Sequence, residues 1–250
     1  MRLLRRRDLS HRERCTSQPL ALVYRGRKPV EMACAEAVAL LLRASSWCFE
    51  VEFVGPRERR PLSAETLCDA ALYAQPGGGT LEKSFRRLGP QSGNVRDYVA
   101  SGGRYLGTCL GGYLAGATPG FDLLPGDTDR YIDLAGASVR HDGDAIIPVL
   151  WRGQRRDMYF QDGPHFVLDS EDGVEILARY TNGAIAALVA SYGRGRVGVV
   201  GPHPEATVDW FDEVGGPNCA TNCSDLGQDL VDTLMQPQWK SAVSHPYESR

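Results

Sequence analysis

Short apolar runs alternate with amphipathic segments over the first half of the chain. The runs have the length of buried strands, and the segments between them show helical spacing or a helix-capping residue at their start. Strand and helix therefore alternate, which predicts a parallel sheet with helices on both faces. The expected strands are residues 20–24, 48–54, 71–74 and 105–106. The expected helical segments are 30–43, one that starts at Ser63, 94–100 and 113–115.

The pattern changes between about residues 118 and 192, where helical spacing fades. Short strand-like runs replace it, separated by turn signals such as Asp142-Gly143. A hairpin with its turn at Gly193-Arg-Gly195 then returns the chain to the core. We therefore expect an antiparallel β excursion attached to the parallel sheet, followed by two helices. The strand-like runs are 145–150, 157–160, 174–180, 184–192 and 196–200, and the helical runs are 206–211 and 226–235.

Composition separates both ends of the chain from a central domain. Residues 1–18 are rich in arginine, but the apolar run that follows at 20–24 is too short for a twin-arginine export signal. We expect a disordered leader there, or a start codon assigned too early. Residues 19–236 form the predicted domain. Residues 237–250 are polar and are predicted to be a flexible tail.

Charge and hydrophobicity narrow the range of partners. Hydrophobic content of 42% and charged content of 24% are ordinary for a globular protein. A net charge of −3 gives no reason to expect nucleic acid or an anionic membrane as the main partner. No apolar run approaches the ~20 residues of a membrane span. We therefore expect a small-molecule substrate, with no nucleic-acid and no membrane partner.

The seven cysteines are scattered, which suits a reducing compartment better than a disulfide framework. We therefore expect a cytoplasmic protein. Cys219 and Cys223 are close enough in sequence to ligate a metal or to form a local disulfide, and their role stays open. No second cysteine pair or histidine pair lies near them, so neither a metal nor another cofactor is expected.

The stretch from Arg104 to Gly116 has the layout of a nucleophile elbow. A short apolar run ends at Leu106, small residues flank Cys109, and a helix-compatible segment follows. Glycines permit backbone angles that are closed to other residues. The turn also places the thiol of Cys109 near a helix N-terminus, where the dipole favours thiolate. A packing cysteine in a plain glycine-flanked turn is the alternative.

Two further loops carry candidate site residues. Pro76-Gly-Gly-Gly79 is either a simple loop or an oxyanion hole, in which main-chain N–H groups converge on a developing negative charge. Phosphate binding is disfavoured because no Gly-Lys-Ser/Thr follows. In His203-Pro-Glu205 an extended segment can place the carboxylate beside the imidazole, while the other ring nitrogen faces a thiol. A surface histidine is the alternative there.

Five motifs, in this order, resemble the class I glutamine amidotransferase-like superfamily, whose members have a flavodoxin-like α/β sheet and a Cys-His-Glu triad. Within it the likeness is to the domain at the N-terminus of eukaryotic biotin-protein ligases, which also occurs as a stand-alone bacterial protein. The likeness spans about residues 19–236. The biotin-transferring part of those ligases has no counterpart in this sequence, so biotin ligation is not implied. The motifs are Tyr24-Arg-Gly26, Pro76-Gly-Gly-Gly79, Gly107-Thr-Cys-Leu-Gly-Gly-Tyr113, Tyr159-Phe-Gln-Asp-Gly163 and His203-Pro-Glu205.

The resemblance implies a role for each candidate residue. Tyr113 stands where glutamine-hydrolysing members carry Gln, and a phenol lacks the paired donor and acceptor of an amide. Glutamine is therefore in doubt as substrate, although the biotin-ligase-type domain is known to carry Tyr there. For Asp162 and His165 the residues alone favour a structural or substrate-facing role over catalysis. The implied roles are a catalytic triad of Cys109, His203 and Glu205, an oxyanion hole at Gly78, Gly79 and Leu110, and substrate contacts at Tyr113, Gln161, Asp162 and His165.

The resulting hypothesis is a cysteine-dependent hydrolase or amidase that acts on a small amide through a thioester. Two alternatives stay open. One is a non-catalytic member that binds a metabolite or a partner protein. The other is a glutaminase subunit that supplies ammonia to a separate synthetase. A homodimer and a complex with such a synthetase are the assemblies considered.

Overall fold

The structure is a computed structural model that describes residues 18–214 and 223–237. Almost all of the predicted leader (residues 1–18) and of the predicted tail (237–250) lies outside the described residues. Cys219 also lies outside them. Within the described residues, no helix is both long enough and apolar enough to cross a membrane.

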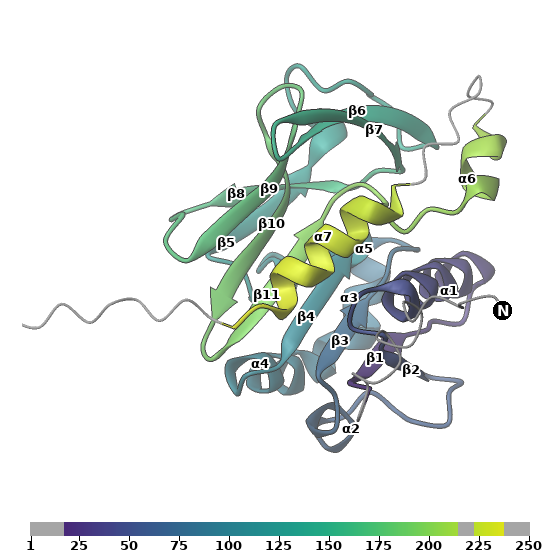
Figure 1. Cartoon of the computed structure of the whole chain (residues 1–250), viewed down its shortest axis with the longest axis vertical. Coiled ribbons are helices and arrows are strands. Elements are labelled where there is room, and N and C mark those ends of the chain that lie inside the picture. The colour runs from purple at the N-terminus through teal and green to yellow at the C-terminus, as the bar shows by residue number, and fades with distance from the viewer. Residues whose placement is uncertain (1–17, 215–222, 238–250) are drawn as a thin grey trace, which may run out of the picture.

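Among the described residues, five neighbouring strands form a parallel sheet through the centre of the molecule (Figure 1). They lie in the order β2-β1-β3-β4-β11, and each neighbouring pair is parallel. This is the strand order of a doubly wound, flavodoxin-like sheet, so the predicted fold class is confirmed. The strands are β1 (Leu20–Tyr24), β2 (Glu50–Val54), β3 (Leu72–Gln75), β4 (Arg104–Thr108) and β11 (Gly195–Val200).

An antiparallel extension continues the sheet from β11 through β10, β9, β6 and β7. β8 pairs with both β10 and β5. The excursion expected around 118–192 is therefore confirmed, as is the hairpin with Gly193 in its turn. The pattern does not predict β5 or β8, because β5 is polar and lacks alternating apolar residues. The strands are β5 (Gly126–Arg130), β6 (Ala145–Trp151), β7 (Gln154–Phe160), β8 (Pro164–Leu168), β9 (Val174–Tyr180) and β10 (Ile185–Tyr192).

Helices cover both faces of the parallel strands. Side chains of α1 and α7 belong to one buried cluster, and side chains of α4 and α5 belong to the other. The sequence pattern does not predict α3, which directly follows the glycine loop. The helices are α1 (Pro29–Ala44), α2 (Ala64–Cys68), α3 (Leu81–Leu88), α4 (Ser92–Ala100), α5 (Leu110–Ala115), α6 (Val208–Glu213) and α7 (Ser224–Met235), with 3₁₀ turns η1 (Gly89–Gln91) and η2 (Tyr131–Asp133).

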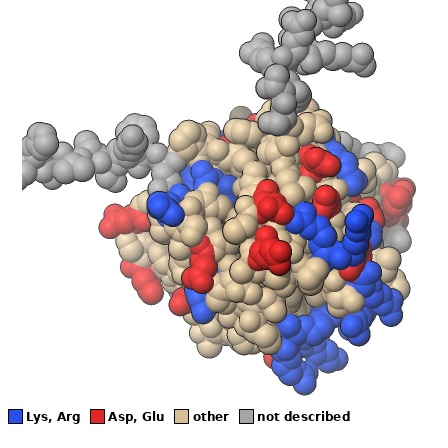
Figure 2. Space-filling model, turned by 90° about the horizontal axis from the view of Figure 1, so that it is seen from below, with Lys and Arg blue, Asp and Glu red and all other residues tan. Residues whose placement is uncertain are grey.

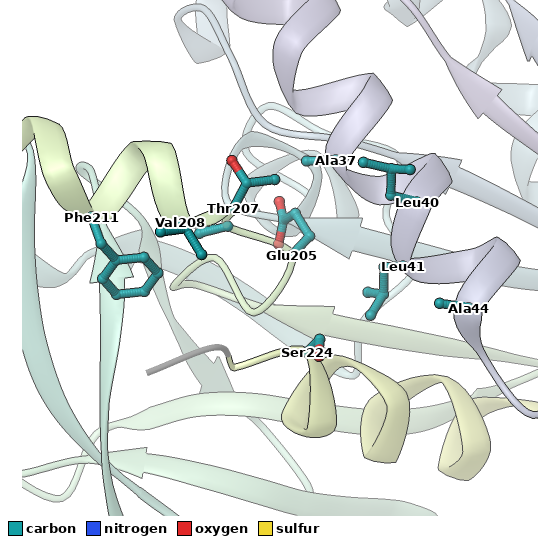
Figure 3. A pocket seen from close by; sticks show the side chains of 10 residues that line it. Ala37, Leu40, Leu41, Ala44, Glu205, Thr207, Val208, Phe211 and Ser224 are labelled. Atoms are coloured by element: carbon teal, nitrogen blue, oxygen red, sulfur yellow. The ribbon is translucent and has the colours of Figure 1, made fainter. Parts of the chain in front are cut away.

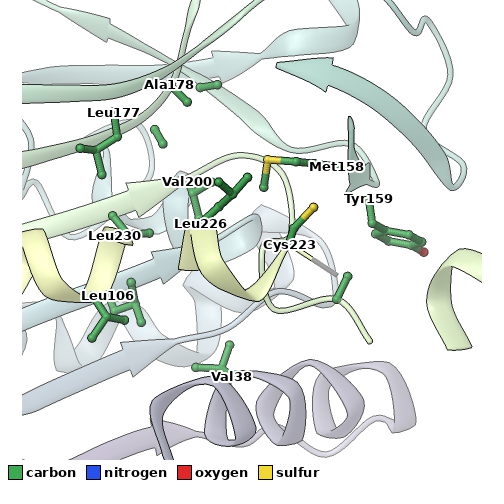
Figure 4. Close-up of a cluster of buried hydrophobic side chains, with 14 of the residues drawn as sticks. Val38, Leu106, Met158, Tyr159, Leu177, Ala178, Val200, Cys223, Leu226 and Leu230 are labelled. Carbon is green, nitrogen blue, oxygen red and sulfur yellow. The ribbon is translucent and has the colours of Figure 1, made fainter. Parts of the chain in front are cut away.

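Burial on both faces explains the continuous apolar runs of the central strands. Ala21 and Val23 of β1 face the cluster beneath α1 and α7, whereas Leu22 faces the opposite cluster. Figure 4 shows the first cluster, to which Leu106 of β4 and Leu230 of α7 both belong. A strand that is covered on both faces needs apolar residues at successive positions rather than at alternate ones.

Acidic and basic side chains are mixed on the face of the molecule seen in Figure 2. Basic side chains gather toward the lower edge of that view, with acidic ones above and beside them. The face seen in Figure 2 therefore carries charges of both signs rather than a continuous basic surface.

Candidate functional site

Three loops meet at one edge of the sheet because the strands that precede them are neighbours. β3, β4 and β11 lie side by side, and Gln75 and Val199 are both in register with Gly107. The chain leaves these strands at loop 76–79, at Cys109 and at loop 201–205. Parallel strands end at the same edge of a sheet. Segments that are far apart in the sequence are thus brought together.

Cys109 occupies a strained turn between β4 and α5. Its φ of 48° and ψ of −107° lie outside the regions that non-glycine residues prefer. The Cys109 N–H donates to the carbonyl of Val200 in β11 (2.9 Å), and the Cys109 carbonyl accepts from the N–H of Tyr113 in α5 (3.1 Å). Strand, tight turn and helix therefore follow one another as predicted for a nucleophile elbow.

The glycines around Cys109 are required for close packing. A side-chain carbon at Gly111 would overlap with the carbonyl oxygen of Gln75 in β3, and one at Gly107 would overlap with the carbonyl oxygen of Gly111. Backbone therefore packs directly on backbone between β3, β4 and α5. Only glycine fits at these two positions.

His203 and Glu205 lie directly against each other in the loop after β11. Nδ1 of His203 is 3.0 Å from Oε1 of Glu205, and the hydroxyl of Thr108 donates to the same oxygen (2.8 Å). The imidazole is 3% exposed and the side chain of Glu205 is fully buried. The N–H of His203 donates to the carbonyl of Tyr159 (2.9 Å). Glu205 thus holds the ring, Thr108 holds Glu205, and the bond to Tyr159 holds the main chain of His203.

The sulfur of Cys109 is a hydrogen-bonding neighbour of the His203 side chain. Burial by itself lowers the pKa of His203, but the charges and hydrogen bonds of Cys109 and Glu205 outweigh burial and raise that pKa to about 10. The imidazole is therefore cationic near neutral pH. The sulfur also contacts the main-chain carbonyl of Gln161 (3.4 Å).

Two aromatic rings pack against the imidazole. Tyr159 and Trp210 meet it edge to face, with centroid distances of 5.7 and 5.4 Å. Gly77 lies against another part of the ring, because a side-chain carbon there would be 2.8 Å from Cε1 of His203 and 3.4 Å from Cβ of Cys109. Sequence patterns gave no signal for Tyr159 or Trp210 as ring contacts, since both contacts depend on the tertiary fold.

A buried carboxylate supports the glycine loop from below. Glu31 of α1 accepts hydrogen bonds from Arg87 (2.7 Å) and from the N–H groups of Arg27 and Lys28. Burial raises the pKa of Glu31, but the hydrogen bonds from Arg87 and Lys28 prevail and lower it. A side chain at Gly26 would overlap with this carboxylate. Gly26 of the Tyr24-Arg-Gly26 motif therefore leaves space for the Glu31 carboxylate. Sequence reasoning did not predict this role of Glu31.

Gly78 and Gly79 adopt backbone angles that favour glycine, with φ of 94° and 92°. Main-chain atoms of Glu31 lie close to Gly78, and the Glu31 carboxylate lies close to Gly79. The loop is therefore held in a left-handed conformation directly above α1. Its role as an oxyanion hole stays a prediction.

A cavity of about 490 Å³ opens above the sulfur of Cys109. This volume is typical of a site for a small molecule. Most of the residues that the sequence pointed to line it, and Arg130, which sequence reasoning did not single out, lines it as well. The predicted residues around the cavity are Gly78, Gly79, Cys109, Leu110, Tyr113, Gln161 and Asp162.

Arg130 and Asp162 form a bidentate ion pair at this cavity. Nε and Nη2 of Arg130 donate to the two carboxylate oxygens of Asp162 at 3.1 and 2.9 Å. The side-chain amide of Gln161 donates to Asp144 (2.7 Å). Tyr113 is 9% exposed, and its hydroxyl is buried with no hydrogen-bond partner in the structure.

His165 is placed differently from the other predicted contacts. It lies on β8 in register with Asp129 of β5, is buried, and is not among the residues that line the cavity. Burial lowers the pKa of His165, and the charge of Asp129 opposes this effect. A substrate contact by His165 stays a prediction that the cavity does not support.

A second cavity of about 330 Å³ is lined in part by Glu205 (Figure 3). Leu40 and Leu41 of α1 line it from one side, and Val208 and Phe211 of α6 line it from the other. The second oxygen of Glu205, Oε2, is buried with no hydrogen-bond partner. Glu205 therefore lines this apolar cavity and not the Cys109 cavity.

No group of three or more His, Cys, Asp or Glu side chains within the described residues is arranged to hold a metal ion. Cys223 is buried, and its thiol donates to the main-chain carbonyl of Asp157 (3.3 Å).

Residues 20–129 match the model of the family described as "Biotin-protein ligase, N terminal". This range includes the glycine loop and Cys109 and stops before His203. The biotin–protein ligase of Schizosaccharomyces pombe (strain 972) is 26% identical over 227 residues, which cover 75% of this chain. The match covers 33% of that ligase, so the chain spans about a third of its curated relative.

Solved structures show the same fold. A crystal structure titled as glutamine amidotransferase matches with a TM-score of 0.57 and 19% identity, covering 85% of this chain and 97% of its own. A cytoplasmic protein of Salmonella typhimurium LT2 matches with a TM-score of 0.53 and 13% identity, at 86% and 99% coverage. An exo-β-1,4-mannosidase from Opitutaceae bacterium strain TAV5 carries a similar unit (TM-score 0.51, 16% identity), covering 87% of this chain and 36% of the mannosidase. Because proteins with such different names share the fold, the fold alone does not assign an activity.

Proposed function

We propose that this chain, which belongs to the class I glutamine amidotransferase-like superfamily and is related to the biotin-protein ligase N-terminal family, is a cysteine-dependent hydrolase of an amide bond. The main support is the hydrogen-bonded series from Thr108 through Glu205 to His203, which ends at the sulfur of Cys109. A buried imidazole that is held by a carboxylate beside a thiol is the arrangement that activates a cysteine nucleophile. A packing cysteine requires none of these contacts.

In the proposed first half-reaction, the Cys109 sulfur attacks the carbonyl carbon of the amide and a C–S bond forms. The carbonyl electrons move onto oxygen, where N–H groups of Leu110 and of Gly78 or Gly79 would stabilise the charge, each by about 10²–10³-fold in rate. The C–N bond then breaks, and His203 delivers a proton to the leaving amine. A thioester on Cys109 and a free amine result.

In the second half-reaction, His203 takes a proton from water, and the resulting nucleophile attacks the thioester carbonyl. The C–S bond breaks, a carboxylic acid leaves, and the proton returns to the Cys109–His203 pair. Glu205 keeps Nδ1 of His203 occupied, so that Nε2 is the nitrogen that exchanges the proton. Thr108 is a positioning residue in this scheme, because it holds Glu205 and does not face the cavity.

Selective alkylation tests the nucleophile. Iodoacetamide at pH 7 should label Cys109 at least about tenfold faster than Cys68, which is exposed and serves as a reference thiol in the same molecule. His203→Ala should remove this advantage while leaving the rate at Cys68 unchanged. Equal rates at the two cysteines in the unmodified protein would contradict the proposal and favour a non-catalytic binding protein.

Ammonia release separates a general amidase from a glutaminase. The hydroxyl of Tyr113 replaces the amide that the family uses to hold glutamine, so we expect no ammonia from glutamine. Release of ammonia that is lost in Cys109→Ser would instead support the glutaminase alternative. The assay is run on the full chain, alone and with a candidate synthetase.

A further inference from the structure

Acidic side chains outnumber basic ones on the lining of the cavity above Cys109. Of the described residues that line it, Glu82, Asp142 and Asp162 carry carboxylates, and Arg130 carries the one positive charge. Charges of one sign around a concave site focus the electric field there and raise the local concentration of oppositely charged molecules. The lining therefore repels an anionic substrate.

The guanidinium of Arg130 is not available to bind an anion. It is held by two hydrogen bonds to Asp162, at 3.1 and 2.9 Å, and a further contact to Asp133 at 3.4 Å. A planar guanidinium paired to a carboxylate in this way uses its preferred binding geometry fully. Arg87, which lies near Gly77 and Gly78 of the glycine loop, is likewise paired with Glu31.

The N-terminus of α3 also faces the cavity, and a helix N-terminus favours anions. Glu82 lies in the first turn of α3, however, and compensates that partial positive charge. Apart from the main-chain N–H groups proposed for the oxyanion hole, the described residues that line the cavity thus offer no unpaired positive side chain.

The hydroxyl of Tyr113 is a second feature of this cavity, independent of its charge, that fits a bound ligand. Tyr113 lines the cavity, is more than nine-tenths buried, and its hydroxyl has no hydrogen-bond partner. A buried hydroxyl without a partner is costly, and a bound molecule would satisfy it. Because Tyr113 follows Cys109 by one turn of α5, this hydrogen bond would form close to the reacting carbonyl.

We propose that the substrate is a cationic amide, carrying an amine or guanidine group that lies along Glu82, Asp142 and Asp162 while Tyr113 hydrogen-bonds near the scissile bond. This inference rests on the proposed hydrolase function and assigns the substrate class of the same site. The proposal excludes substrates that carry a free carboxylate and no free amine. An example is glutamine whose amine is blocked.

Three methanethiosulfonate reagents test the charge preference directly: two charged reagents of comparable length and a smaller neutral one. Their groups are trimethylammonium-ethyl (cationic), sulfonatoethyl (anionic) and methyl (neutral). Each reacts in the same way: the thiolate attacks the thiosulfonate sulfur, a mixed disulfide forms and methanesulfinate leaves. Rates at Cys109 are read by peptide mass spectrometry and divided by rates at 2-mercaptoethanol, which removes intrinsic reactivity. We expect a normalised cation-to-anion ratio of about tenfold or more, falling as salt is added.

Substitutions test whether the charged residues that line the cavity cause the cation-to-anion rate ratio at Cys109. Glu82→Gln with Asp142→Asn should bring the normalised ratio close to one. Asp162→Asn should free Arg130 and shift the preference toward the anionic reagent, and asparagine tolerates the positive φ of 45° found at this position. Asp172→Asn, in the turn between β8 and β9, serves as the matched control and should leave the ratio unchanged.

The outcomes distinguish the two proposals. If Cys109 reacts selectively with all three reagents but shows no cation preference, or prefers the anion, the substrate class is wrong and the hydrolase proposal stands. A preference that survives the double substitution would also overturn the assignment to Glu82 and Asp142. If Cys109 reacts with none of the reagents faster than Cys68 does, both proposals fail.

Discussion

Thr108 and Glu205 lie 97 residues apart in the sequence and are joined by a buried hydrogen bond of 2.8 Å. Thr108 is the residue directly before Cys109, and Glu205 is the residue that contacts His203. This bond therefore ties the loop of the proposed base to the strand that carries the proposed nucleophile. It exists because β4 and β11 are parallel neighbours with Val200 in register with Thr108.

Thr108→Val should lower the rate of Cys109 alkylation about tenfold. The change keeps the shape of the side chain but removes the hydroxyl that holds Glu205, leaving a buried carboxylate with one fewer donor. Alkylation by iodoacetamide followed from pH 5 to 10 checks this, because a positioning role predicts a changed pH profile as well as a lower rate. Thr108→Ser keeps the hydroxyl and should restore both. A valine variant with a normal profile would show that the bond is only structural.

Gly77→Ala should separate His203 from Cys109. The added carbon would lie 2.8 Å from Cε1 of the imidazole, so the ring must move, and small displacements of a catalytic group cost up to about 10² in rate. Rates of labelling at Cys109 and at the reference thiol Cys68 measure the effect. Gly93→Ala in α4 is the matched control, since its added carbon has no neighbour within 4 Å. Full reactivity in Gly77→Ala would contradict the packing described here.

Gly111→Ala should destabilise the fold by about 3 kcal/mol or more, because the new carbon overlaps with the main chain of Gln75 and neither backbone can move freely. Urea unfolding followed by circular dichroism gives the free energy of unfolding. In the same experiment Gly93→Ala should stabilise by about 0.5–1 kcal/mol, as alanine does in an open helical position. Similar stabilities for the two variants would refute direct backbone packing between α5 and β3.

The free energy of unfolding should fall as pH rises above neutrality. The pKa of His203 is raised to about 10 in the folded chain by Cys109 and Glu205 against burial, and it is about 6.5 when unfolded. Between these values the folded state holds the additional proton, so stability is fully present below about pH 6.5 and is lost toward pH 10. The slope should reach at most about 1.4 kcal/mol per pH unit.

Urea unfolding at a series of pH values from 6 to 10 tests this dependence. His203→Gln should remove most of the slope, whereas His141→Gln, at an exposed position outside the site, should leave it intact. Equal slopes in all three proteins would show that His203 is not the group that titrates.

The sequence by itself determined the fold class and the candidate nucleophile. Apolar runs of strand length that alternate with helical spacing are local properties, so β1, α1, β3 and α7 were predictable from short windows. The nucleophile elbow was also predictable from the sequence, because a turn that passes close to its neighbours requires glycine on either side of Cys109. Chain order and motif likeness then pointed to His203 and Glu205.

Only the tertiary structure decided which other side chains reach the site. Arg87 meets Glu31 across 56 residues, Arg130 meets Asp162 across 32, and Thr108 meets Glu205 across 97. No local pattern encodes such pairings, since each depends on which strands and helices become neighbours. The same reason explains His165, which lies in sequence close to Asp162 but on β8, a strand that the pattern does not predict and that carries it away from the cavity lining.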